Sequence, residues 1–76
     1  MISETYWVLR YRNHIKNSNK SYKYVVVDGD WTPTVRLKDA TLFYTESEAV
    51  FTKDMFGDEQ ASLVIVQKIE IREIVE

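Results

Sequence analysis

One segment of the sequence carries, in order, a helix start, an amphipathic stretch and a helix stop. Residues 45–48 read Thr-Glu-Ser-Glu, a capping-box pattern in which the Thr45 hydroxyl can accept a hydrogen bond from the Glu48 backbone N–H. Gly57 stands where a residue with a positive φ ends many helices. A helix over 46–56 is therefore predicted. Its apolar face, expected to pack on the rest of the fold, consists of Ala49, Phe51, Thr52, Met55 and Phe56.

Most of the remaining chain is typical of β-strands. Strands are predicted over 5–12 and 22–28, which are dense in aromatic and β-branched residues. The Asn- and Ser-rich stretch 13–21 between them is predicted to be a solvated loop, and two such neighbouring strands favour an antiparallel hairpin. A long last strand is expected over 61–76, with its first half under the helix and at the centre of the sheet.

The segment between the hairpin and the helix is less regular. Asp28-Gly29-Asp30 predicts a turn, because Gly29 tolerates a positive φ. Pro33 cannot donate to a ladder, so 31–39 is expected to be mostly loop, at a sheet edge or in an irregular crossing. A short third strand is predicted over 40–44.

These elements predict an α+β fold, in which a small antiparallel sheet of three to four strands carries one helix on one face in the order ββ(β)αβ. Residues 1–76 are expected to form a single domain, since a chain this short buries only roughly 60–65 % of its unfolded surface. No cysteine is present, which favours a cytoplasmic protein without disulfides. No apolar run approaches the ~18 residues of a membrane span, and the N-terminus lacks a signal-peptide pattern.

The usual catalytic and cofactor-binding patterns are missing. His14 is the one histidine and has no partner that would make it a base or a metal ligand. Asp28 and Asp30 could offer two oxygens to a hard cation, but the further ligands of a calcium loop do not follow, so an ordinary turn is preferred. The expectation is therefore a non-enzymatic binding protein with no metal, no cofactor and no catalytic residue.

Charge is divided along the chain. Residues 1–27 hold five basic residues and one acid, a net charge of +4, whereas residues 28–76 hold five basic residues and eleven acids, a net charge of −6. A basic, aromatic hairpin over 10–23 could contact nucleic acid, with tyrosines stacking on bases. The alternative is that the tyrosines are core and the lysines keep a loop soluble. The candidate residues are Arg10, Arg12, Lys16, Lys20, Lys23, Tyr22 and Tyr24.

Two features point instead to protein partners. Acidic stretches could occupy the cationic channel of a nucleic-acid-binding protein, and Trp31 is expected near a sheet edge. The long last strand could outrun its neighbours and pair with a second copy in a homodimer, unless another strand of the same chain covers it. The candidate partner-binding residues are Asp28, Asp30, Trp31, Asp58 and Glu59.

The run Ala40-Thr-Leu-Phe-Tyr-Thr-Glu-Ser-Glu-Ala49, together with the order of strands and helix, resembles small uncharacterised proteins encoded by phages and prophages of Gram-positive bacteria. A Lys-, Asn-, Ile- and Tyr-rich composition fits a low-GC host. The resemblance implies a stoichiometric ligand of host machinery in the host cytoplasm, of the kind that includes anti-CRISPR inhibitors. The leading hypothesis is thus a protein that binds and modulates a host macromolecule. The alternative is a small nucleic-acid-binding accessory protein.

Overall fold

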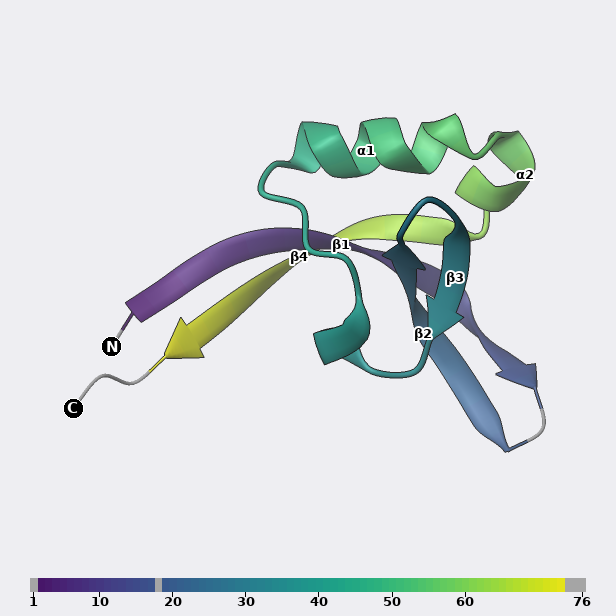
Figure 1. Cartoon of the computed structure of the whole chain (residues 1–76), viewed down its shortest axis with the longest axis horizontal. Helices are drawn as coiled ribbons and strands as arrows, with labels where there is room; N and C mark the ends of the chain where they lie inside the picture. The colour runs from purple at the N-terminus through teal and green to yellow at the C-terminus, as the bar shows by residue number, and fades with distance from the viewer. Residues whose placement is uncertain (1, 18, 74–76) are drawn as a thin grey trace.

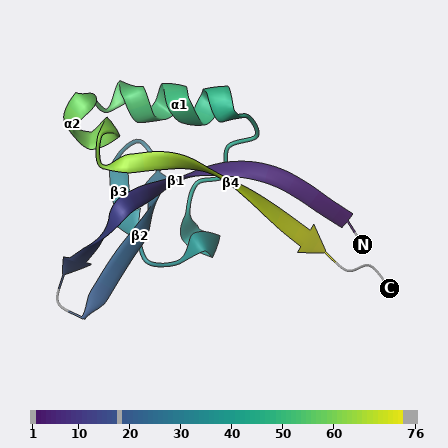
Figure 2. The same ribbon diagram turned by 180° about the vertical axis from the view of Figure 1, so that it is seen from behind.

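The computed structural model describes residues 2–17 and 19–73. A four-stranded antiparallel sheet has the strand order β3-β2-β1-β4, and the main helix packs on one of its faces, as Figure 1 and the reverse view in Figure 2 show. The predicted α+β class is therefore confirmed. The elements in chain order are β1 (Ile2–Asn17), β2 (Lys20–Val27), β3 (Trp31–Thr34), the short 3-10 helix η1 (Leu37–Asp39), α1 (Glu46–Met55), α2 (Asp58–Ala61) and β4 (Val64–Glu73).

β1 is the central strand and holds two ribbons together. Its first part pairs with β4, from Ile2↔Glu73 to Tyr11↔Val64 without a break in register. Its second part pairs with β2 as far as the hairpin end at Asn17↔Lys20. The β1–β4 ribbon and the β1–β2 hairpin therefore project from the body in different directions (Figure 1).

The loop predicted over 13–21 is wrong for most of its length. β1 runs on to Asn17 and β2 begins at Lys20, so the polar residues are paired strand with a short turn. A shift in register between Arg10 and Ile15 accommodates this extension. This stretch has no apolar alternation that would favour a strand. Cross-strand hydrogen bonds stabilise its strand conformation instead, and they place polar residues in the sheet.

The last strand also differs from expectation. β4 is an edge strand, and β1 occupies the central place predicted for it. The apolar start of β4 is covered on one face by the helices, since α1 and α2 both contact β4. Residues 74–76 of the predicted strand lie outside the described residues.

β1 and β2 separate beyond Tyr24, and the chain before α1 fills the gap. The backbones of Trp7 and Phe43 exchange two hydrogen bonds, each of 2.8 Å. On the other side of the gap, the Thr41 hydroxyl lies 2.7 Å from the Val27 backbone N, which donates to it, and 3.3 Å from the Val27 carbonyl oxygen. Residues 41–43 thus join the diverging strands, in place of the short strand predicted over 40–44, which is reduced to a single bridge at Phe43.

The buried core lies between α1 and the middle of the sheet. Alternate residues of β1, Leu9 and Tyr11, face the helix, and half-buried aromatic side chains close the sides of the cluster. Its fully buried members are Leu9, Tyr11, Val25, Ala49 and Val64.

One edge of the core is closed by a row of three aromatic rings. The Trp31 indole N–H donates to the Tyr11 hydroxyl at 2.9 Å, and the Trp31 and Phe56 rings meet edge to face with centroids 5.2 Å apart. Burial raises the pKa of Tyr11, although the hydrogen bond from Trp31 opposes that shift. These contacts attach β3, the edge strand that contains Pro33, to the end of α1. The strand order confirms the predicted edge position, whereas the loop predicted here is wrong over 31–34, which form β3.

The helix has the predicted limits but a different orientation. α1 begins after Thr45, whose hydroxyl accepts from the Glu48 N–H at 3.2 Å, and Gly57 has a φ of +89°. Ala49 is fully buried, and Phe56 packs on Trp31. The prediction that Phe51 and Met55 are buried is wrong, because 68 % of the Phe51 surface and 66 % of the Met55 surface are exposed.

This orientation predicts unequal effects of the same substitution at two phenylalanines. Phe56→Ala should lower the free energy of unfolding by about 2 kcal/mol or more, because it removes the ring that packs on Trp31. Phe51→Ala should change it by less than about 0.5 kcal/mol, since the ring lies on the surface. Urea unfolding followed by far-UV circular dichroism measures both, and equal losses would contradict the observed orientation.

The gap between β1 and β2 gives a second prediction. Thr41→Val should cost about 1–3 kcal/mol, because the Val27 N–H loses its acceptor in a half-buried place. Thr41→Ser keeps the hydroxyl and should lose less. The control is Thr32→Val, the same change on the exposed side of β3, which should be nearly neutral. A neutral Thr41→Val in the same denaturation series would show that this bond does not join the strands.

Candidate functional site

The exposed side of α1 carries a group of apolar side chains that we call the helical face: Val50, Phe51 and Met55. Phe51 and Met55 are one helical turn apart and therefore lie on the same side of α1. The opposite side packs on the sheet through Ala49, so the fold leaves the helical face without a partner among the described residues. An exposed aromatic ring beside a flexible thioether is typical of a contact surface for another molecule.

A second exposed aromatic residue stands just before the helix. Tyr44 is 73 % exposed, and its ring lies 5.6 Å from that of Tyr6, measured between centroids. The Tyr6 hydroxyl donates to a carboxylate oxygen of Glu4, and this bond, together with the negative charge, raises the pKa of Tyr6. Tyr6 lies on the face of β1 opposite Leu9 and Tyr11, so the two tyrosines form a separate aromatic contact and do not continue the helical face.

Carboxylates gather at the other end of the helical face, in a group that we call the acidic corner. The contact between Trp31 and Phe56 brings the β2–β3 turn beside the junction of α1 and α2, and both views show these segments at the same corner (Figure 1, Figure 2). Four of the predicted partner-binding residues are therefore brought together from two distant stretches of sequence. The acidic corner consists of Asp28, Asp30, Asp54, Asp58 and Glu59, all exposed.

Trp31, the fifth predicted partner-binding residue, is used within the fold. Its indole N–H is engaged by Tyr11, and its ring packs on Phe56. Trp31 thus lies beneath the acidic corner and positions the turn that carries Asp30.

The cations of the first half of the chain lie away from the acidic corner. The β1–β2 hairpin projects from the side of the molecule opposite α1, so the two charge signs seen along the sequence are separated in space (Figure 1). Tyr22 and Tyr24 are half-buried, whereas Tyr11 belongs to the core. The exposed cations of the hairpin are Arg12, Lys16, Lys20 and Lys23.

Arg10 differs from the other predicted nucleic-acid-binding residues. It is half-buried on the sheet face opposite α1, and its Nε atom is buried without a hydrogen-bond acceptor among the described residues. Gln67, diagonal to Arg10 in the β1–β4 register, likewise has a buried Oε1 without a donor there. Arg10 is therefore a residue of the sheet surface rather than a free cation of the hairpin.

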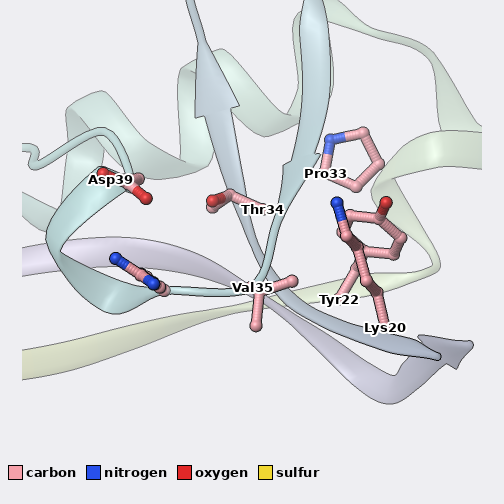
Figure 3. A pocket seen from close by; sticks show the side chains of 7 residues that line it. Lys20, Tyr22, Pro33, Thr34, Val35 and Asp39 are labelled. Atoms are coloured by element: carbon pink, nitrogen blue, oxygen red, sulfur yellow. The ribbon is translucent and has the colours of Figure 1, made fainter.

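An open pocket of about 370 Å³ lies between the first residues of β2 and the segment from the end of β3 to η1. Lys20 and Tyr22 line one side and Asp39 lines the other, with the Thr34 side chain between them (Figure 3), and Arg36 also lines the pocket. Two cations and a tyrosine ring around an open cavity suit an anion with a flat neighbouring group, and Asp39 weakens the local positive potential.

The residues weighed for metal binding and catalysis remain apart. His14 is exposed on β1, and Asp28 and Asp30 flank Gly29 in the turn. In residues 2–17 and 19–73, no three His, Cys, Asp or Glu side chains group as a metal site would require. None of the helices in this part of the chain is long and apolar enough to cross a membrane.

Comparison with protein-family models, with curated proteins and with solved structures gives no match for this chain.

The helical face was not predicted, because Phe51 and Met55 were expected to be buried in the core. A signal was present. The face predicted to be buried is wide: Ala49, Thr52 and Phe56 lie on one side of α1, and Phe51 and Met55 lie on another. One buried stripe needs only one of these two sides, so the other could have been expected to be exposed.

Proposed function

We propose that this chain is a non-catalytic protein that binds a host protein and modulates or inhibits it by direct contact, through the helical face and the acidic corner. The observation that carries the proposal is the exposure of Phe51 and Met55 on a helix whose other side already packs on the sheet. Neither side chain is needed to fill the core. Their surface is available to a partner.

The chemistry of the helical face suits a protein partner. Binding energy at protein interfaces concentrates in a few aromatic and large apolar side chains that enter pockets on the partner. Phe51 can act as such an anchor, and Met55 can adapt its shape beside it.

The acidic corner indicates the charge of the partner. Five exposed carboxylates beside the helical face project a negative field, which attracts a cationic surface and raises the rate of encounter. Cationic channels that hold nucleic acid are such surfaces. A defence nuclease bound in this way would be blocked, because the carboxylates take the place of phosphates.

The first test is affinity capture from the lysate of a low-GC Gram-positive bacterium, followed by measured affinities for the captured protein. Phe51→Ala/Met55→Ala should weaken binding by about thirtyfold or more, equivalent to about 2 kcal/mol. Asp54→Asn/Asp58→Asn/Glu59→Gln should mainly slow association and flatten its dependence on salt. Nucleic acid should compete with this chain for the partner.

The matched control is Ile15→Ala, which truncates an exposed apolar side chain on the hairpin. It should leave the affinity unchanged. If the helix variant binds as tightly as this control, the helical face is not the interface.

The second candidate function is nucleic-acid binding by the β1–β2 hairpin. It is favoured by the projection of the hairpin from the body (Figure 1) and by the pocket, which is lined by Lys20, Tyr22 and Arg36. Lysine and arginine would contact phosphates, and the tyrosine ring would stack on a base. The net charge of −2 of the whole chain opposes this binding, so the attraction would be local.

A mobility-shift titration with single- and double-stranded nucleic acid, at low and moderate salt, tests the second candidate. Arg12→Ala/Lys16→Ala/Lys20→Ala/Lys23→Ala should weaken retention and reduce the salt slope by about 0.7–0.9 for each phosphate contact removed. Lys53→Ala on α1 is the control for lost charge. Arg10 is left unchanged because it is part of the sheet surface. No retention by the unaltered chain at low salt would remove this function.

A further inference from the structure

β4 presents a long open edge. It is the last strand of the sheet on its side, and its ten residues include no proline. The register with β1 is continuous over its whole length, so no bulge twists the edge away. Proteins usually protect such an edge by bulges, prolines or short length, because its free N–H and C=O groups can pair with another strand.

The hydrogen bonds of β1 show which residues of β4 direct their backbone N–H and C=O groups away from β1, toward the open edge. The Arg12 N–H donates to the Leu63 carbonyl at 2.9 Å, in the same register as the β1–β4 ladder. Hydrogen-bonded pairs alternate along an antiparallel ladder, so Trp7 and its partner Lys68 point their backbone groups away from each other. Trp7 accordingly bonds Phe43 on its far side. The outward residues of β4 are Val66, Lys68, Glu70 and Arg72.

We infer that β4 pairs antiparallel with β4 of a second copy, with the twofold axis at Ile69, to form a homodimer with one continuous sheet. Pairing two outward edges requires even-numbered residues to face even-numbered residues. An axis at Ile69 places Lys68 opposite Glu70 of the second copy, twice by symmetry. An axis at Lys68 or at Glu70 would instead place two like charges opposite each other, which is unfavourable.

This register also uses most of the edge. It pairs residues 65–73 of both copies, which is nearly the whole of β4. Lysine on an edge strand often prevents association, but a glutamate two residues further on the same face makes this edge self-complementary. Glu70 also takes part in interactions within its own chain, and the new ion pair would add to them.

The shape of the molecule favours the same occupant. The end of the β1–β4 ribbon is only two strands wide and projects beyond the helix (Figure 2). Two-stranded ribbons are marginally stable, and joining two copies would make this part four strands wide, in the order β1-β4-β4-β1.

Sedimentation equilibrium of the whole chain, with two charge reversals and their combination, tests this inference. The unaltered chain should dimerise. Lys68→Glu and Glu70→Lys should each weaken dimerisation by roughly tenfold or more, because each creates two like-charge pairs across the axis. Lys68→Glu/Glu70→Lys should restore it. Inside one chain these residues face Trp7 and Thr5, so the reversals place no like charge opposite them in the β1–β4 ladder.

Two controls make the result specific. Lys23→Glu reverses a charge on the hairpin and should leave dimerisation unchanged. Lys68→Pro removes the outward N–H together with the Lys68 charge and should abolish it. A monomer at every concentration overturns the inference, as does a dimer in which the double reversal fails to restore what the single reversals lose. A dimer dissociated by Phe51→Ser but not by these changes would lie on the helical face and overturns it too. The inference is independent of the proposed partner.

Discussion

The contact between Ala49 and the middle of β1 determines how α1 lies on the sheet. Alanine is small, so the helix can approach the sheet closely over Leu9 and Tyr11. Phe56 then reaches Trp31 at the edge of the core, and the rest of the helix is fixed in rotation between these two contacts. Phe51 and Met55 are consequently turned outward. The surface that makes a binding function plausible is therefore a direct result of how the core is packed.

The sequence was informative wherever the deciding interaction is local. The limits of α1 follow from the Thr45 cap and from Gly57, which act within a few residues of themselves, and the β-strands follow from alternation and residue type. The rotation of α1 was not predictable in this way, because two sides of the helix are apolar and the choice depends on Trp31, which is distant in sequence. The extension of the hairpin into the Asn- and Ser-rich stretch depends on cross-strand pairing, which no local composition reveals. The edge position of β4 depends on strand order, for the same reason.

The candidate site shows the same division. Asp58 and Glu59 were recognisable as a charged pair in the sequence, but their neighbourhood with Asp28 and Asp30 exists only because Trp31 and Phe56 pack together. Arg10 is separated by the fold from residues that are near it in sequence. The sequence groups it with the hairpin cations, but in the sheet its Nε atom is buried. Position in the fold, rather than residue type, distinguishes the exposed cations of the hairpin from the half-buried Arg10.

The charge separation and the open edge of β4 have a joint consequence. The proposed twofold axis lies on β4, whereas the helical face belongs to α1 and the acidic corner to the β2–β3 turn and the junction of α1 and α2. Pairing through β4 would thus leave both surfaces uncovered and would present each of them twice. A partner with two equivalent sites could then be bound at both, and the second contact would form at the high effective concentration set by a rigid sheet rather than by a flexible linker. Against a partner with one site, the second copy would add nothing to affinity beyond a statistical factor, so the number of sites on the partner decides what dimerisation contributes.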